Sequence, residues 1–426
     1  MYTMHIRWRS SPFLTGRRWR KRLPEPFTEV PGGVAAPKHF QAAGVSCGLK
    51  ESGGRDLALI YSETPATAAA LFTTNRVVAA PVELSRENVE KGLIRAILIN
   101  SGNANACTGE QGLRDAREMA EIAAHQLGIS PKEILVASTG PIGRLLPMDR
   151  VRKGIELAVS SLTPTGGGKA AEAILTTDTR PKEVAVQFEI GERTVTLGGM
   201  AKGSGMIAPH LATLLAFITS DIKIEKGCLK TCLQRAVDKS FDMITVDGDT
   251  STNDMVAVLA NGAAGNDEVV SGTPGEALFQ EALNHVCIEL AKMIVKDGEG
   301  ATKFLEIRIK GAASQEDARK AAMAVANSNL VKTAFFGEDP NWGRIICALG
   351  YSGAELHPNR LDLYFGDEQI VKAGSPLEHA QEKLRQILKS PEIVVHANLH
   401  IGESEAVVWT CDLSYDYVRI NSQYHT

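Results

Sequence analysis

Aromatic residues are scarce in this sequence, at 5% of 426 residues. Small and aliphatic side chains must therefore fill the core, and the 39 glycines let backbone segments approach one another closely. No apolar run approaches the 18 residues of a membrane-spanning helix, so we expect no membrane span. A strong basic charge is missing as well, because the formal net charge is −4. This balance argues against a nucleic-acid partner.

The sequence also lacks a disulfide framework and a clear metal-ligand set. Its seven cysteines are odd in number and scattered, which favours a reducing compartment. Cys228 and Cys232 stand four apart on a predicted helix and could bind a metal, but no second ligand pair stands at a suitable spacing. His396 and His400 share one face of a strand-like run over 393–401, again without a third ligand. We therefore expect buried thiols and no metal site.

The N-terminal segment has no acidic residue before Glu25 but carries seven arginines and lysines within residues 1–24. An Arg-rich, acid-free stretch is typical of a transit peptide and equally of a plain extension. The apolar stretch of a secretion signal is missing. We assign residues 1–30 to a basic extension that is expected to be disordered. The expected location is the cytoplasm, with an organelle matrix as the alternative.

Strand-like and helix-like segments alternate from residue 30 to the end, without a regular βαβ repeat. Helical periodicity predicts helices over 114–127, 148–162, 227–239, 276–295, 315–327 and 377–388. Short apolar or alternating runs predict strands over 96–100, 184–188, 194–197, 214–218, 304–309, 361–365, 393–398 and 405–411. The pattern predicts an α/β fold, a layered sandwich of largely antiparallel sheets and helices.

Two glycine-rich stretches fail as phosphate-binding motifs. Gly168 and Lys169 are followed by Ala170 where a P-loop needs Ser or Thr. The stretch 203–208 matches a loose dinucleotide pattern, but Pro209 and a strand-like run follow it instead of a helix. Neither stretch therefore predicts a nucleotide site.

The stretch 202–221, KGSGMIAPHLATLLAFITSD, has a different interpretation. A loop of small residues leads into Ala212 and Thr213, and an N→O acyl shift needs such a loop so that a hydroxyl can reach the preceding carbonyl. After cleavage Thr213 would own an α-amine with a pKa of about 8, which could act as base for its hydroxyl. From this segment alone, an ordinary β-branched residue at the start of a strand is the simpler interpretation.

Nine segments that stand in the same order as in a known family favour the cleavage interpretation over an ordinary strand start. The sequence closely resembles the ornithine acetyltransferase family, also called glutamate N-acetyltransferase, from about Gly32 onward. The segments that carry the resemblance are GGVAAPKHF (32–40), LFTTNR (71–76), NSGNANACTG (100–109), STGPIG (138–143), ILTTDT (174–179), DGDTSTND (247–254), KDGEGATK (296–303), GEDPNWGRI (337–345) and YDYVRINSQYHT (415–426). Two departures stand out: His39 replaces the usual Gly, and His210-Leu211 replaces the commoner Asn-Met.

The resemblance implies a role for each matching residue. Thr213 matches the nucleophile after cleavage between Ala212 and Thr213, and Thr139 with Gly140 matches the oxyanion-hole pair. The matching substrate-binding positions are Thr176, Lys202, Thr213, Glu299, Asn421 and Thr426. Lys202 suits a substrate carboxylate, and Glu299 suits the ammonium group of ornithine.

The resemblance further implies self-cleavage into chains 1–212 and 213–426, in which residues 31–212 form the first chain after its basic extension. It also implies a heterotetramer with two copies of each chain and a fold shared with self-cleaving aminopeptidases. Acetyl would pass from N2-acetylornithine to Thr213 and then to glutamate, without a metal or organic cofactor. Some members also accept acetyl-CoA, and both donors stay open here. Two other functions stay open too: a self-processing amidase or aminopeptidase with water as acceptor, and a binding protein with an intact chain.

Overall fold

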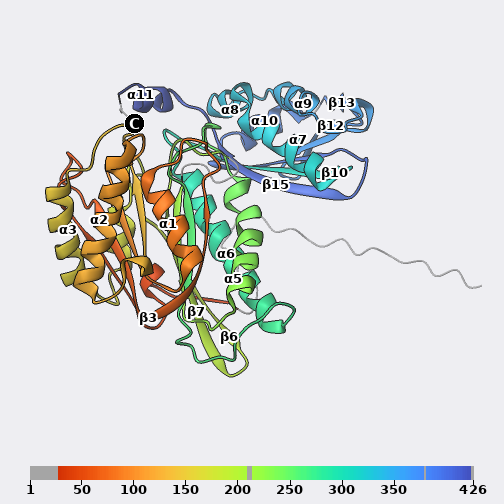
Figure 1. Ribbon diagram of the computed structural model, residues 1–426. Helices are drawn as coiled ribbons and strands as arrows, with labels where there is room; N and C mark the ends of the chain where they lie inside the picture. The colour runs from red at the N-terminus through yellow and green to blue at the C-terminus, as the bar shows by residue number, and fades with distance from the viewer. Residues whose placement is uncertain (1–26, 209–213, 379, 424–426) are drawn as a thin grey trace, which may run out of the picture.

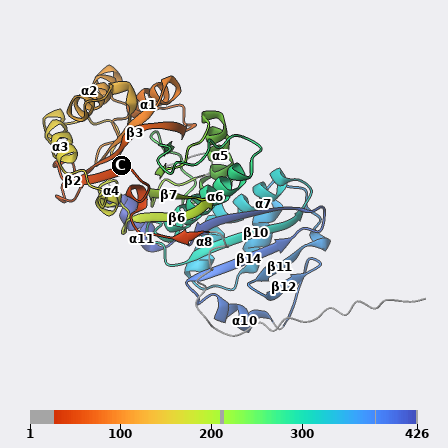
Figure 2. The ribbon, with the colours of Figure 1, turned by 90° about the horizontal axis from the view of Figure 1, so that it is seen from below.

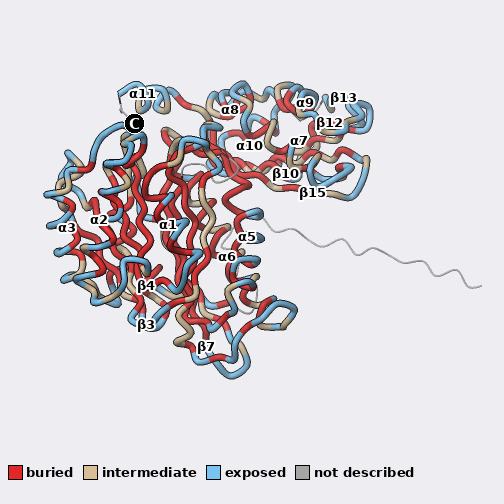
Figure 3. The backbone as a smooth tube through the Cα atoms, in the orientation of Figure 1, coloured by how far each residue is buried: buried red, intermediate tan, exposed pale blue. Residues whose placement is uncertain are grey.

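The protein folds into two lobes joined by a continuous hydrophobic core (Figure 1). The structure is a computed structural model that describes residues 27–208, 214–378 and 380–423. The first lobe is a four-layer sandwich in which two sheet layers lie between two layers of helices. Figure 3 shows buried segments in the interior of this lobe and exposed segments along its outer edges. Among the described residues, no helix is both long and apolar enough to cross a bilayer.

One long strand, β3 (Leu57–Phe72), links the two sheet layers of the first lobe. Its first half pairs with β2 and β4, its second half pairs with β9, and the register shifts between Tyr61 and Ala66. The described residues form a nine-stranded sheet in the order β1-β6-β7-β8-β9-β3-β4-β5, with β2 beside β3. The other bounds are β1 (Thr28–Glu29), β2 (Phe40–Val45), β4 (Ile94–Ser101), β5 (Ile134–Thr139), β6 (Lys182–Ile190), β7 (Arg193–Lys202), β8 (Leu215–Ser220) and β9 (Met255–Ala260).

Aliphatic side chains fill the space between the sheet layers and under the helices. Ile97 and Leu135 from one layer share a buried cluster with Phe217 and Leu259 from the other. The outer helices are α1 (Ala80–Lys91), α2 (Gly109–Leu127) and α3 (Met148–Ser160) on one side, and α5 (Lys226–Asp238) and α6 (Pro274–Lys296) on the other (Figure 1). The short helix α4 (Gly167–Ala173) belongs to the cluster between the sheet layers. Small residues on the buried face of α2 let this helix lie close to the sheet, as the low aromatic content predicts.

The second lobe is a sheet in the order β13-β12-β11-β14-β10-β15, with helices packed against it (Figure 2). Its strands are β10 (Phe304–Ala312), β11 (Asp362–Phe365), β12 (Glu368–Lys372), β13 (Ser375–Pro376), β14 (Glu392–Asn398) and β15 (Ser404–Cys411). Its helices are α7 (Gln315–Asn327), α8 (Asn329–Phe336), α9 (Trp342–Gly350) and α10 (Ala380–Ile387). The chain then returns to the first lobe, where α11 (Tyr415–Gln423) lies above the sandwich in Figure 1.

The predicted fold class is confirmed. Within the described chain the parallel pairs are β4–β5, β8–β9 and β10–β14, and all other strand pairs are antiparallel. Each predicted helix and strand has a counterpart, and the helix expected to stop before Gly128 ends there with Gly128 in the left-handed conformation at φ 66°. The predicted hairpin is β6–β7.

Two boundaries differ from the prediction. Residues 27–30, which we assigned to the extension, belong to the fold: Phe27 is buried edge-on against Phe188, and β1 pairs with β6. The remainder of that extension, residues 1–26, lies outside the described residues. The strand expected over 393–401 ends at Asn398, so His400 does not share a strand face with His396.

Candidate functional site

Five of the motif segments, 100–109, 138–143, 174–179, 247–254 and 296–303, contribute to one end of the sandwich, around the start of β8. In the antiparallel pair β7–β8, Lys202 at the end of β7 lies opposite Leu215. In the parallel pair β8–β9, Leu215 lies opposite Met255. Ala212 and Thr213, the predicted cleavage site, lie outside the described residues, as does Thr426. The chain on either side of residues 209–213 is described, and it enters this end of the sheet.

Two carboxylates from one loop hold both sides of that segment. On the upstream side, Asp247 accepts hydrogen bonds from the amides of Met206 (2.7 Å) and Ile207 (2.9 Å). On the downstream side, Asp254 accepts a hydrogen bond from the amide of Leu214 (2.8 Å). Asp247 and Asp254 are the first and last residues of the DGDTSTND segment. The loop therefore fixes where the chain enters and leaves the predicted cleavage site.

Thr139 and Gly140, the predicted oxyanion pair, end β5 in a tight turn. Gly140 has φ 139°, and a Cβ added there would lie 2.4 Å from the amide nitrogen of Asn103 and 2.6 Å from the carbonyl carbon of Gly102. Only glycine fits such a close approach. Within the described chain the Thr139 hydroxyl makes no hydrogen bond, and Thr139 is 8% exposed. A polar donor in this position can serve a bound oxygen atom.

Asparagine side chains hold this turn rigidly. Asn253 donates to the carbonyls of Ala104 (2.6 Å) and Ser138 (2.9 Å) and so ties the DGDTSTND loop to the end of β5. Asn100 donates to the carbonyl of Asn103 (2.9 Å) and accepts from the Ser138 hydroxyl (2.6 Å). The predicted oxyanion turn and the flanks of the predicted cleavage site are thus parts of one hydrogen-bonded framework. Preorganised donors of this kind are what transition-state stabilisation requires.

Lys202, a predicted substrate-binding residue, is buried in a network of ion pairs. Its ammonium group donates to the Thr176 hydroxyl at 2.7 Å and lies 3.8 Å from Asp178. Lys182 bridges Asp178 (2.7 Å) and Asp297 (2.6 Å), and all these charged side chains are less than 5% exposed. The network joins Thr176 and Lys202, two residues that the resemblance assigns to substrate binding.

Asp178 and Asp297 carry as many negative charges as Lys182 and Lys202 carry positive ones, and these opposite charges influence the pKa values of the group. Burial by itself raises the pKa of Asp178, but the ammonium groups of Lys202 and Lys182 and the Gly203 amide outweigh it and hold that pKa well below its usual range. Burial lowers the pKa of Lys202, and the charge of Asp178 opposes this shift. Asp178 is therefore ionised at neutral pH, as a partner for both lysines.

Replacing Lys182 with methionine tests this network. Two buried carboxylates would lose their shared cation, so we expect the free energy of unfolding to fall by about 3–5 kcal/mol. Chemical denaturation followed by circular dichroism measures the change. The control is Lys320→Met, which removes an exposed helical ion pair with Glu316 and should change little. Equal effects of the two substitutions would contradict a structural role for the network.

Glu299 joins the predicted cleavage loop to the C-terminal helix. Its carboxylate accepts a hydrogen bond from Asn421 on α11 at 2.7 Å, and its amide donates to the carbonyl of Ser204 at 2.9 Å. A Cβ added to Gly205 would lie 2.3 Å from a Glu299 carboxylate oxygen. Tyr417 of the same helix donates to Asp247 at 3.1 Å. The structure thus brings Glu299 and Asn421 together beside the loop that leads to Thr213.

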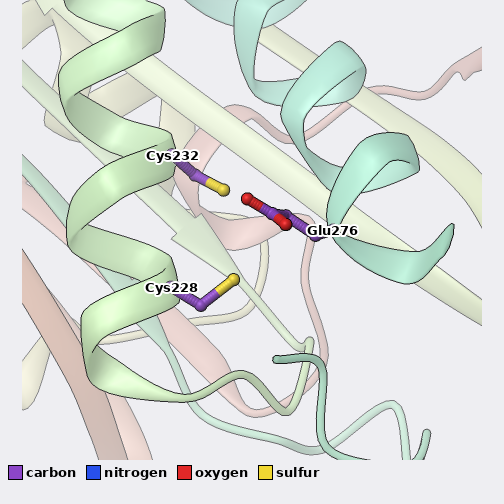
Figure 4. A group of neighbouring side chains, drawn as sticks. All are labelled: Cys228, Cys232 and Glu276. Carbon is purple, nitrogen blue, oxygen red and sulfur yellow. The ribbon is translucent and has the colours of Figure 1, made fainter. Parts of the chain in front are cut away.

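Cys228 and Cys232 gain a third neighbour that the sequence did not reveal. Figure 4 shows their sulfur atoms facing the carboxylate of Glu276, and the three ligand atoms lie within 4.8 Å of one another. Both carboxylate oxygens are already engaged, one by Arg235 at 3.0 Å and the other by the Gly272 amide at 2.5 Å. Burial raises the pKa of the Cys228 thiol and raises that of Cys232 to about 12. In this structure the two thiols and the carboxylate, which Arg235 and the Gly272 amide hold, form a packed contact between α5 and the start of α6.

The two histidines make different direct contacts. His396 stacks on Tyr364 with ring centroids 5.3 Å apart, and burial lowers its pKa. His400, beyond the end of β14, contacts Asp362 at 2.9 Å. Among the described residues, neither imidazole belongs to a cluster of three potential metal ligands.

Comparison with known proteins decides the family. The ArgJ family profile matches residues 41–426. The arginine biosynthesis bifunctional protein ArgJ of Symbiobacterium thermophilum is 56% identical over 397 residues, which cover 93% of this chain and 99% of that protein. This chain belongs to the ArgJ family. The predicted family is confirmed, and with it the prediction that the chain is an enzyme.

Solved structures of similar sequence match about half of the chain. The arginine biosynthesis bifunctional protein argJ of Bacillus halodurans is 44% identical and covers 49% of this chain and 98% of its own, with a TM-score of 0.48. The ornithine acetyltransferase of Mycobacterium tuberculosis, complexed with ornithine, is 41% identical and covers 43% of this chain and 98% of its own, with a TM-score of 0.40.

One departure from the ArgJ family pattern has a structural explanation. His39 has φ 62°, in the left-handed region that glycine adopts without strain. Its ring contacts Glu63 at 2.7 Å on the surface. Glycine, which the resemblance expects at this position, would adopt this conformation without strain. The other departure, His210-Leu211, lies outside the described residues.

The sequence analysis missed the acidic residues that organise the site. They are Asp178, Asp247, Asp254 and Asp297, and each lies in one of the nine segments that carry the ArgJ resemblance. Their positions in those segments were the available signal. Which lysine or amide each would contact could not be read from the sequence, because the partners lie up to 118 residues away along the chain.

Proposed function

We propose that this ArgJ family member is a glutamate N-acetyltransferase that moves acetyl from N2-acetylornithine to glutamate through acetyl-Thr213. The observation that carries the proposal is the anchoring of both sides of residues 209–213 by Asp247 and Asp254, within the framework that holds Thr139 and Gly140. A nucleophile at position 213 would lie on a fixed strand start. Thr139 and Gly140 are the proposed oxyanion donors.

The proposed activation is self-cleavage. The Thr213 hydroxyl attacks the Ala212 carbonyl, and the peptide C–N bond breaks as an ester forms and the nitrogen takes a proton. Water then hydrolyses the ester, which leaves a carboxylate on Ala212 and an α-amine on Thr213. The first 212 residues contribute β7, and residues 213 onward contribute β8 to the same sheet. Strand pairing of this kind would keep the two chains together.

The proposed transfer has two half-reactions. The Thr213 hydroxyl, deprotonated by its own α-amine, attacks the acetyl carbonyl of N2-acetylornithine, and ornithine leaves with the proton. The α-amine of glutamate then attacks the ester, and Thr213 recovers its proton as N-acetylglutamate leaves. Lys202 and Thr176 would bind the substrate carboxylate, and Glu299 and Asn421 would bind the ammonium group of ornithine. Thr426 is proposed to complete this site, and acetyl-CoA is a second candidate donor.

Incubation with N2-acetylornithine alone distinguishes a transferase from a hydrolase on the same fold. The proposal expects release of one ornithine per active site in a burst and then a stop, until added glutamate restarts turnover. Continuous release of ornithine and acetate without glutamate would instead identify water as the acceptor. The absence of any ornithine release would contradict both reactions.

Replacing Glu299 with glutamine should weaken binding of ornithine-type substrates selectively. The neutral amide keeps the size of the side chain but loses the charge that would pair with ornithine, so we expect the KM for N2-acetylornithine to rise about ten- to a hundredfold. Steady-state kinetics with each substrate in turn measure the change. Glu403→Gln, on the exposed surface of the second lobe, is the matched control. An unchanged KM would remove Glu299 from the substrate site.

Assembly and location complete the proposal. We infer a heterotetramer with two copies each of chains 1–212 and 213–426, as the resemblance implies. All seven cysteines are free thiols, which supports a reducing compartment such as the cytoplasm. The proposed partners are small molecules, with neither nucleic acid nor membrane among them.

A further inference from the structure

The two amino acids of the proposed reaction carry side chains of opposite charge, and the residues assigned so far can pair with only one of these side chains. Ornithine carries a side-chain ammonium group, for which Glu299 is suited, whereas glutamate carries a side-chain carboxylate. Glu299 would repel that carboxylate. Glutamate therefore needs a cation beyond the one that binds its α-carboxylate.

The charge of Lys202 influences both Lys182 and Lys50 or is influenced by them. These three lysines differ in how many of their ammonium N–H groups already donate hydrogen bonds. Lys182 has no N–H left, because it donates to Asp178, to Asp297 and to the Arg180 carbonyl. Lys202 is already assigned to the α-carboxylate. The third is Lys50, whose only hydrogen bond from its ammonium group within the described chain goes to the Arg55 carbonyl at 2.6 Å. An ammonium group has three N–H donors, so Lys50 has two for a ligand.

Lys50 lies against the proposed oxyanion turn. A Cβ added to Gly102 would lie 3.2 Å from Cγ of Lys50, and one added to Gly140 would lie 2.6 Å from the carbonyl carbon of Gly102. The stem of Lys50 thus packs on the backbone that packs on Gly140. The charge of Lys202 is near enough to influence Lys50, as is that of Asp178. Lys50 therefore packs beside the oxyanion turn, within electrostatic range of Lys202 and Asp178.

A loop that Asp56 holds by hydrogen bonds keeps Lys50 in this position. Asp56 is fully buried, and its carboxylate accepts hydrogen bonds from four successive amides, at 2.7, 3.0, 2.6 and 3.2 Å, from residues 47–50. The Asp56 carbonyl also accepts a hydrogen bond from the amide of Ser101 at 2.8 Å. Asp56 thereby fixes the loop that carries Lys50 to the strand end that carries Gly102. An exposed lysine on a surface loop would not have such an anchor.

We propose that Lys50 binds the side-chain carboxylate of the amino acid that accepts the acetyl group. The inference rests on the proposed acetyl transfer and adds the residue that selects glutamate as acceptor. The same site then takes two side chains of opposite charge, with Glu299 serving ornithine and Lys50 serving glutamate.

The protonation of Lys50 supplies an independent readout. Burial and the charge of Lys202 lower the pKa of Lys50 to about 8, while Asp56 and Asp178 oppose the shift. Selection of glutamate over glutamine, which has the same size without the charge, should therefore weaken as pH rises through about 8. Arginine stays charged throughout this range. In Lys50→Arg the preference for glutamate should persist above pH 8.

The experiment uses acetyl-enzyme prepared with N2-acetylornithine and freed of ornithine by rapid gel filtration. Its deacetylation is followed against the concentration of glutamate and, separately, of glutamine, for wild type, Lys50→Gln, Lys50→Arg and the exposed control Lys153→Gln. In Lys50→Gln we expect the half-saturating glutamate concentration to rise about ten- to a hundredfold, with the glutamine curve close to that of wild type. Lys153→Gln should match wild type with both acceptors.

Each outcome decides a separate question. Equal effects of Lys50→Gln on glutamate and glutamine, or no effect on either, would overturn the role of Lys50. If Lys50→Gln does not fold, the ratio of glutamate to glutamine reactivity still tests the proposal. A ratio that does not change with pH between 7 and 9 in wild type would overturn it. A ratio that falls with pH in Lys50→Arg as much as in wild type would overturn it too. If wild type forms no acetyl-enzyme at all, the proposed function itself fails.

Discussion

Thr213→Ala is expected to leave the chain uncut and to abolish acetyl transfer. Alanine has no hydroxyl to attack the preceding carbonyl, so neither the N→O shift nor the acetyl ester can form. Loss of a covalent nucleophile typically removes the whole chemical contribution of that residue, on the order of 10⁶-fold in rate. Denaturing gel electrophoresis and the ornithine-release assay measure the two effects on the same sample.

Thr213→Ser is the matched control for that substitution. Serine keeps the hydroxyl and loses only a methyl group, so cleavage and transfer should persist, with slower rates. An uncut Thr213→Ala protein that still transferred acetyl would separate the two roles and contradict the account. Cleavage in Thr213→Ala would place the nucleophile elsewhere.

Thr139→Val is expected to lower the rate of acetyl transfer about 10²–10³-fold. Valine has the shape of threonine without the hydroxyl, so the tight turn at Gly140 and the hydrogen bond from the Asn103 amide to the Thr139 carbonyl at 3.1 Å should be kept. The loss would appear in kcat, with little change in KM, because an oxyanion donor acts mainly in the transition state.

Thr139→Ser should restore most of that rate, since it returns the donor. Circular dichroism and thermal unfolding of the three proteins check that the fold is unchanged. A rise in KM alone would assign Thr139 to substrate binding, and an equal loss in Thr139→Ser would assign it to packing in place of oxyanion stabilisation.

Local patterns were sufficient for part of the fold, and strands β2, β5 and β9 had no predicted counterpart. Helical periodicity and a terminal glycine placed α2, and the hairpin β6–β7 followed from alternating strands around Gly191. The central strand β3 escaped prediction because its sequence, LALIYSETPATAAALF, contains a proline and an alanine-rich half. Its register shift between Tyr61 and Ala66 accommodates this interruption, and only pairing with β2, β4 and β9 makes the whole segment one strand. Tertiary pairing of that kind overrides local propensity.

The candidate site was predictable in its parts and not in its assembly. Motif resemblance named Thr139, Lys202 and Glu299, and the structure places them in segments that meet at one end of the sandwich. The ion pairs between Lys182 and the two aspartates depend on burial, which the sequence does not display. The four amides that donate to Asp56 could not be predicted, because their positions depend on the folded backbone of residues 47–50.

Intact mass under denaturing conditions, before and after incubation with N2-acetylornithine, tests the central claim most directly. The account predicts two chains that meet at Ala212 and Thr213, with one acetyl group added to the second chain only, and removed again by glutamate. A single chain of 45.7 kDa that is active, or an acetyl group on the first chain, would contradict it.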